Sequence, residues 1–164
     1  MKILDQQQIQ QKIKRLAIEI LENNFEEQEI ILAGINNTGM GFARMILEEL
    51  QKITDIHLTL TRIRLNPAAP LSQEVSVEMP LEGLNGKAII VIDDVANTGR
   101  TIFYAVKPIL DILPKKVEVA VLVNRTHKSF PIMVDYVGLS LATTLMDDID
   151  VQIQDVEELA VYLN

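Results

Sequence analysis

Several features that would place a protein in a familiar class are missing from this sequence. It contains no cysteine, which excludes a disulfide framework and metal sites built from thiolates. No apolar run approaches the roughly 18 residues that suggest a membrane span. The chain turns polar at residues 5 and 6, so no signal peptide is visible. We therefore expect a cytoplasmic protein that does not associate with a membrane.

Positive charge is also scarce. The chain has 15 Lys and Arg residues against 23 Asp and Glu residues, a formal net charge of −8. Broad binding to nucleic acid depends on neutralising many phosphates, so this balance disfavours binding to RNA, although a local basic patch stays open. A phosphate site in this chain has to be local, built from loop amides, helix ends and a few placed arginines.

The pattern of apolar residues predicts one domain of alternating helices and strands. With 164 residues and 48% apolar content, the chain can bury a substantial core. Apolar spacing predicts helices over residues 5–24, after a polar turn at 36–39, over about 101–113 and over 156–163. It predicts strands over residues 30–34, 56–64, 89–93 and 117–123, with another beginning at 135–138. We expect an α/β fold with a mostly parallel central sheet and helices on both faces.

Residues 66–86 differ in character from the rest. Three prolines and two glycines punctuate this segment, with polar residues between them. A connection of this length inside a compact domain is usually functional, so we expect a flexible lid. The alternative is a plain surface excursion with a hairpin through residues 74–78.

The most informative stretch is residues 89–101, where an apolar run ends in Asp93-Asp94 and a short loop precedes a helical pattern. The carboxylates can hold sugar hydroxyls or a divalent metal, and the loop and helix start offer N–H groups to an anion. A P-loop is excluded because the sequence has no G-x-x-x-x-G-K-[ST] motif. A phospho-receiver domain is disfavoured because the acidic pair lies past mid-chain. Helix capping accounts for one Asp or Thr, but not for the whole string.

Other polar residues follow the remaining strands, at residues 34–37, 62–64 and 124–127. Ligands of open parallel sheets bind beyond the carboxyl ends of the strands. We therefore expect all of these segments to meet at one site.

Residues 91–101 resemble the phosphoribosyl-diphosphate signature of the type I phosphoribosyltransferases. Residues 120–132 with 135–138, together with residues 3–5 and 58–62, are similar to the pyrimidine operon attenuator/uracil phosphoribosyltransferase branch. The resemblance spans nearly the whole chain. It implies an enzyme that transfers the phosphoribosyl group of phosphoribosyl diphosphate to a nucleobase, with uracil giving UMP. The alternative is a nucleotide-sensing regulator of pyrimidine genes, with weak or no catalysis and RNA as a possible partner.

The resemblance also implies roles for individual residues. Asp93 and Asp94 would act in catalysis and hold Mg²⁺. Arg62 would act in catalysis and bind pyrophosphate. The expected cradle for the 5′-phosphate is Val95, Ala96, Asn97, Thr98, Gly99, Arg100 and Thr101. The expected pyrophosphate loop is Asn36, Asn37, Thr38 and Gly39. The expected nucleobase residues are Arg125, His127, Tyr136 and Val137. Tyr136 is equally compatible with the core, and the alternative for His127 is a solvated loop histidine hydrogen-bonded to a neighbour. Relatives generally form dimers or larger homo-oligomers, and we expect the same here.

The sequence departs from the family pattern at three places. The pyrophosphate loop, typically Lys-Thr-Arg-Gly, has neither cation here, which weakens its grip on the leaving group by about 1–3 kcal/mol unless another residue compensates. Arg64 and Lys128 are candidates for that compensation. The family's Asp and Gly around the arginine are Asn124 and Thr126. Asn97 stands where purine-using relatives place an aspartate base; because its amide cannot accept a proton, that mechanism is disfavoured.

Overall fold

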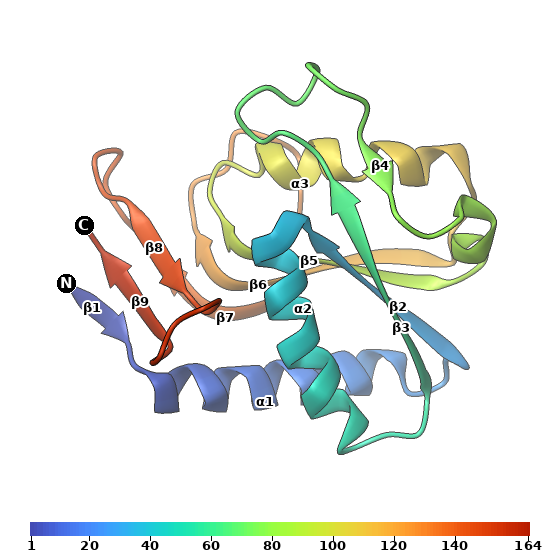
Figure 1. Ribbon diagram of the computed structural model, residues 1–164, viewed down its shortest axis with the longest axis horizontal. Coiled ribbons are helices and arrows are strands. Elements are labelled where there is room, and N and C mark those ends of the chain that lie inside the picture. The colour runs from blue at the N-terminus through green and yellow to red at the C-terminus, as the bar shows by residue number, and fades with distance from the viewer.

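The computed structural model describes residues 1–164 and has an α/β architecture (Figure 1). The strands of the main sheet are β2 (Glu29–Ile35), β3 (His57–Arg64), β4 (Ser76–Val77), β5 (Ala88–Ala96), β6 (Lys116–Arg125) and β7 (Tyr136–Leu141). The helices are α1 (Gln6–Asn24), α2 (Asn36–Gln51) and α3 (Arg100–Ala105), and the 3₁₀ helices are η1 (Leu81–Leu84) and η2 (Lys107–Asp111). The expected fold class, a mostly parallel sheet covered by helices, is confirmed.

The order of the strands explains where the site lies. The sheet runs β4-β3-β2-β5-β6-β7, and all neighbours are parallel except β4, which is antiparallel to β3. From β2 the chain passes to β3 on one side, and β5 then returns to the other side of β2. The connections that follow β2 and β5 therefore diverge, and such a reversal opens a crevice at the carboxyl ends of the two strands.

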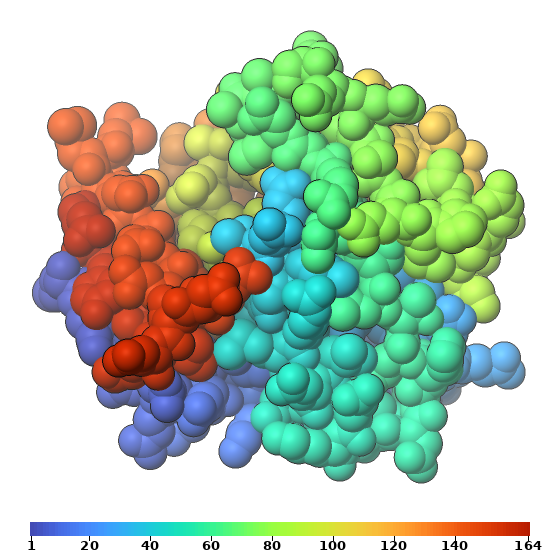
Figure 2. All heavy atoms as spheres, in the orientation of Figure 1, coloured from blue at the N-terminus to red at the C-terminus, as the bar shows by residue number.

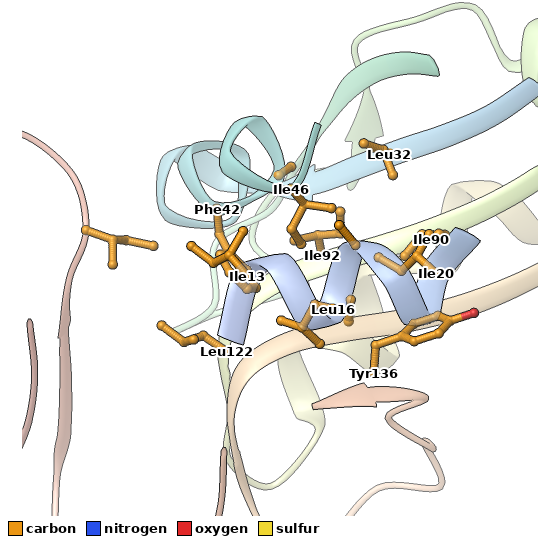
Figure 3. Packing of buried hydrophobic residues seen from close by; sticks show 14 of the residues in the cluster. Ile13, Leu16, Ile20, Leu32, Phe42, Ile46, Ile90, Ile92, Leu122 and Tyr136 are labelled. Atoms are coloured by element: carbon orange, nitrogen blue, oxygen red, sulfur yellow. The ribbon is translucent and has the colours of Figure 1, made fainter. Parts of the chain in front are cut away.

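Two apolar layers hold the helices on the sheet. On one face α1 and α2 pack against the strands (Figure 3). Helix α1 begins where its sequence predicts, because the Asp5 carboxylate accepts the Gln8 N–H at 2.8 Å and the Gln8 side chain accepts the Asp5 N–H at 2.9 Å. On the other face α3 and both 3₁₀ helices pack against alternate residues of the same strands. Period-two alternation along β5 supplies both layers.

A second, three-stranded antiparallel sheet joins the two ends of the chain. Its order is β1-β9-β8, with β1 at Lys2–Leu4, β8 at Ile149–Gln152 and β9 at Ala160–Leu163. The hood comprises these three strands and the connections 142–148 and 153–159. In Figure 1 it stands beside the carboxyl ends of the main sheet, and the connection 153–159 reaches the N-terminal end of α2.

One predicted helix is longer than the helix observed, and another is wrong. The helix expected over 101–113 ends at Ala105 and continues as the short η2, because Pro108 has no N–H and its ring obstructs an α-helix. The helix expected over 156–163 is β9, which pairs with β1 and β8. A short apolar run is equally compatible with a helix and a strand, and here pairing with the distant N-terminus decides for the strand.

The segment 66–86 is only partly free of the core. Residues 76–77 form β4, which pairs with β3 instead of forming a hairpin within 74–78, and both Val75 and Leu84 are buried in the second apolar layer. A lid over residues 66–86 stays a prediction, and its mobile part would have to lie before Val75, where residues 71–74 are exposed. No helix of the protein is long and apolar enough to cross a membrane, and the cytoplasmic location also stays a prediction.

Candidate active site

The acidic pair lies at the carboxyl end of β5, beside β2. Asp93 is 7% exposed and Asp94 is half-buried. The carboxylate of Asp93 accepts the Asp94 backbone N–H at 2.9 Å, and that of Asp94 accepts the Val95 N–H at 2.8 Å. Local backbone groups therefore fix the orientation of both side chains before any ligand binds.

Burial makes the ionised pair costly. It raises the pKa of the Asp93 carboxyl well above its usual value, and the neighbouring Asp94 charge raises this pKa further. Burial also raises the pKa of the Asp94 carboxyl. A positive charge brought to the pair relieves both costs. Such a site is suited to a cation, or to a sugar that becomes positive during a reaction.

The loop after the acidic pair surrounds a cavity of about 480 Å³. Every residue expected in the phosphate cradle lines it, from Val95 to Thr101, and Ile102, Ser129 and Phe130 complete the wall. Gly99 has a φ of 89°, and a Cβ at this position would lie 2.6 Å from the Ile132 side chain, so only glycine fits. The Thr98 carbonyl oxygen accepts the N–H groups of Ser129 and Phe130 at 2.9 and 3.2 Å, which fixes the loop against its second wall.

The expected pyrophosphate loop is the first turn of α2 rather than a separate turn. The Asn36 side chain is already engaged: its Nδ2 donates to the Leu65 carbonyl oxygen at 2.9 Å, and its Oδ1 accepts the Leu65 N–H at 3.1 Å. It joins the ends of β2 and β3. Asn37 and Thr38 are exposed, and a Cβ at Gly39 would lie 2.5 Å from the Ile92 carbonyl oxygen. What this turn offers an anion is therefore backbone N–H groups.

Arg62 lies on β3, level with Gly34 of β2. Its Nη1 is 3.7 Å from the Glu78 carboxylate, and its buried Nε has no hydrogen-bond partner. Arg64 donates to the same carboxylate at 3.0 Å from Nε and at 2.6 Å from Nη2. A buried N–H without a partner is unfavourable, so Arg62 is under-satisfied in the ligand-free protein.

A second, smaller pocket of about 210 Å³ adjoins the cradle. Arg125 and His127 line it, and Asn97 and Thr98 belong to both walls. Arg125 holds the hood in place: it donates to Thr143 Oγ1 at 2.6 Å and to the Thr144 carbonyl oxygen at 2.9 Å. Its Nη1 also reaches Asn97 Oδ1 at 3.4 Å. The guanidinium thus connects the cradle to the hood.

Tyr136 and Val137 do not line this pocket, and for Tyr136 the core alternative holds. They are the first two residues of β7, and Tyr136 is buried in the core beneath α1. Its hydroxyl donates to the Glu118 carboxylate at 2.9 Å and accepts from Asn24 Nδ2 at 3.3 Å. The cause is the direction of the chain: the amino end of a parallel strand lies away from the ligand edge.

Sequence reasoning missed several residues that line the pockets. The hood contributes Thr143, Thr144 and Leu145 to the smaller pocket. Ser129 and Phe130 close the larger one. The resemblance over residues 120–132 includes Ser129 and Phe130 but gives them no role, and no local motif marks Thr143, Thr144 and Leu145, because these residues meet the loop 95–101 only through folding.

Carboxylates are the available ligands for a hard cation. No group of three or more His, Cys, Asp or Glu residues is arranged to hold a metal ion, so the Asp93-Asp94 pair could supply only part of a coordination shell. This donor set fits Mg²⁺, which keeps several waters and binds through one or two carboxylates together with substrate phosphates.

Comparison with known proteins identifies the family. Residues 1–160 match the phosphoribosyl transferase domain. The chain belongs to this family. The enzyme class and the family expected from the motifs are thereby confirmed.

Relatives named bifunctional protein PyrR match over nearly their whole length. The protein from Streptococcus uberis is 35% identical over 158 residues, covering 94% of this chain and 91% of the relative. The protein from Macrococcus caseolyticus is 33% identical over 162 residues, covering 95% and 93%.

Solved structures of other family members share the fold. The hypoxanthine phosphoribosyltransferase of Trypanosoma cruzi has a TM-score of 0.79 at 14% identity, covering 98% of this chain and 95% of that chain. A hypoxanthine-guanine phosphoribosyltransferase from Bacillus anthracis has a TM-score of 0.71 at 21% identity, covering 85% and 81%. At these identities the likeness concerns the fold alone.

Proposed function

We propose that the protein transfers the phosphoribosyl group of phosphoribosyl diphosphate to uracil, giving UMP and pyrophosphate. One observation carries the proposal: the two pockets share the walls Asn97 and Thr98. A ribose 5-phosphate held in the larger pocket directs its anomeric carbon toward a planar base in the smaller one. Holding both reactants in this way converts an encounter in solution into a unimolecular step.

The acidic pair then acts on the sugar. As the bond to pyrophosphate lengthens, the ribose acquires positive charge, and the Asp93 and Asp94 carboxylates favour that charge. The two carboxylates also accept hydrogen bonds from the ribose hydroxyls. Burial raises the pKa values of both carboxyls, so a positive charge next to the pair would stabilise their ionised form.

The leaving pyrophosphate goes to the N–H groups at the start of α2 and to Arg62. The unpartnered Nε of Arg62 supports this assignment, because an anion would satisfy it. Mg²⁺ would arrive with the diphosphate, bind to oxygen atoms that include those of Asp93 and Asp94, and neutralise part of the leaving group's charge.

Uracil fits the smaller pocket better than a purine on two grounds. The Asn97 amide cannot serve as the proton acceptor of an aspartate-assisted purine reaction. The pocket is also small, about 210 Å³, and threonine hydroxyls dominate its polar lining. Hydroxyls donate and accept, as the alternating N–H and C=O groups of uracil require. Arg125 positions the hood side of this pocket, and His127 lies on its wall.

The test is direct. The protein is incubated with phosphoribosyl diphosphate, Mg²⁺ and one of uracil, hypoxanthine, guanine or xanthine, and the release of pyrophosphate is followed. We expect turnover with uracil above all others. Absence of turnover with every base would contradict the proposal, and preference for a purine would contradict the assignment of the base.

The resemblance also leaves a regulatory role as the alternative function. Lys12 and Arg15 line a groove beside α1, and this is the local basic surface that RNA would need. The net charge of −8 opposes it. A shift of pyrimidine-operon leader RNA at low salt in the presence of UMP would support the alternative, and no shift would remove it.

We further propose that two copies associate through an apolar groove of about 490 Å³ between α3, η2 and residues 131–135. Leu110 and Met133 are 76% and 73% exposed there. Lys107 and Asp135 also line the groove. Because a two-fold axis brings the same surface of each copy together, Lys107 of one copy can meet Asp135 of the other.

A further inference from the structure

Gln154 of the hood lies against the first turn of α2. It belongs to the connection 153–159, and Figures 1 and 2 show this segment resting on the N-terminal part of α2. Ile153 is buried in the same apolar layer as Phe42 of α2, so the connection is anchored immediately before Gln154. The side-chain amide of Gln154 donates a hydrogen bond to the Asn37 carbonyl oxygen at 2.5 Å.

Glycine makes this contact possible. A Cβ at Gly41 would lie 2.8 Å from both Cγ and Cδ of Gln154. Residues 37 and 41 are one helical turn apart and share a face, whereas Gly39 lies on the far side of the helix, against the Ile92 carbonyl oxygen. The first turn of α2 is therefore held between β5 on one side and Gln154 on the other, and a glycine lies at each contact.

The turn that is held this way has no cationic side chain. Its first N–H groups have no acceptor within the helix, and no side chain caps them. The peptide group between Asn37 and Thr38 receives the Gln154 hydrogen bond on its oxygen and presents its N–H at the helix start. Hydrogen bonds in series polarise one another, so the contact makes the Thr38 N–H a stronger donor to an anion.

We propose that Gln154 is a positioning residue for pyrophosphate. It fixes the first turn of α2 and strengthens the N–H groups that receive the leaving group. The inference rests on the proposed function, since it assigns a role within the same site. It also connects the hood, which borders the base pocket, to the pyrophosphate loop, so a displacement of the hood weakens pyrophosphate binding.

Isothermal titration tests this without requiring turnover. Phosphoribosyl diphosphate, pyrophosphate and UMP are each titrated, with Mg²⁺, into the wild type, Gln154→Ala and Gly41→Ala. Gln152→Ala is the matched control, because its side-chain amide donates a hydrogen bond to Asp150 within the hood and not to α2. We expect Gln154→Ala to weaken the two pyrophosphate-containing ligands by about threefold to tenfold, the net worth of one hydrogen bond, and to leave UMP unchanged. Gly41→Ala, which displaces the Gln154 side chain, should reproduce this pattern.

The outcomes separate the two ideas. If the wild type binds neither phosphoribosyl diphosphate nor UMP, the proposed function fails and the role of Gln154 falls with it. If the wild type binds both and Gln154→Ala binds all ligands equally well, only the inference fails. Equal weakening of UMP and pyrophosphate, or the same loss in Gln152→Ala, would show a general distortion of the hood and would also overturn it. Melting temperatures of all variants are measured in parallel.

Discussion

The buried acidic pair should lower the stability of the folded protein, and Asp93→Asn isolates that effect. An unfolded Asp has a pKa near 3.9, whereas burial and the Asp94 charge raise the pKa of Asp93 in the folded state. The folded state therefore binds this proton more tightly than the unfolded state. Above about pH 4 the unfolded state ionises more readily, so stability falls as pH rises until the folded pKa is passed.

Asparagine removes the charge and keeps the shape. Its Oδ1 can still accept the Asp94 N–H, at 2.9 Å in the wild type. At pH 8 we expect the variant to gain about 1–3 kcal/mol in unfolding free energy, the scale set by burying an imperfectly compensated polar group. For a chain of this size each kcal/mol raises the melting temperature by about 2–4 °C. The gain in stability should shrink toward zero as the pH approaches 4. Independently of pH, the substitution should lower the transfer activity by at least about a hundredfold.

Thermal and urea unfolding between pH 4.5 and 8 measure this, with Asp111→Asn as the control because Asp111 is exposed at the end of η2. A variant less stable than the wild type at pH 8 would refute the reasoning, and so would a gain that does not depend on pH. A similar pH-dependent gain in the control would show that the effect comes from net charge rather than burial.

Three further changes test other parts of the site. Glu78→Gln removes the carboxylate that competes for Arg62, so the KM for phosphoribosyl diphosphate should fall, by about fivefold at most because an exposed ion pair is worth about 0.2–1 kcal/mol. Arg125→Lys replaces a guanidinium that contacts the cradle and the hood at once, and steady-state kinetics should show the KM for uracil rising about tenfold, with a smaller effect on phosphoribosyl diphosphate. Leu110→Glu places a charge in the apolar groove, and light scattering should show monomer in place of the proposed dimer.

Each of these has a matched control and a contradicting outcome. Glu74→Gln is the control for Glu78→Gln. An increase in the KM of Glu78→Gln for phosphoribosyl diphosphate would mean that Glu78 orients Arg62 instead of competing for it. Arg44→Lys, on the exposed side of α2, controls for Arg125→Lys, and an unchanged KM for uracil would contradict the hood-holding role. Leu113→Glu is equally exposed but lies outside the groove, so an unaltered dimer in Leu110→Glu would place the interface elsewhere.

Local chemistry explains what the sequence predicted well. Helix α1 carries its own start signal in Asp5 and Gln8, and the string 93–101 contains every residue it needs for a strand end, a tight loop and a helix start. Such features depend on neighbours within a few residues, and a short window therefore suffices to recognise them.

Contacts between distant segments explain what the sequence did not predict. The Gln154 bond to Asn37 spans 117 positions, and Arg125 reaches Thr143 across 18. Tyr136 illustrates a different error: it belongs to the correct strand but lies at the wrong end of it. The sequence predicts that the strand begins at residues 135–138, and Tyr136 pairs with Ala120 of β6 at that beginning, so its pocket role comes from the resemblance and not from its place on the strand.

The cations around the site have protein partners before a ligand arrives, although one N–H of Arg62 is left without an acceptor. These cations are the positive charges available to compensate for the uncharged pyrophosphate loop. Arg100 donates to the Pro67 carbonyl oxygen at 2.7 Å, Arg62 approaches Glu78, and Lys128 donates to Asn124 Oδ1 at 2.7 Å. When a substrate binds at such a site, its oxygen atoms replace protein oxygen atoms as the hydrogen-bond acceptors of these cations. Replacing a neutral carbonyl by a phosphate oxygen is favourable, because hydrogen bonds to charged groups are worth about 1.5–3 kcal/mol against about 0.5–1.5 for neutral ones. For Arg100 the exchange would break its hydrogen bond to the Pro67 carbonyl oxygen, so we predict that a phosphate in the cradle frees the start of the proposed lid segment 66–74.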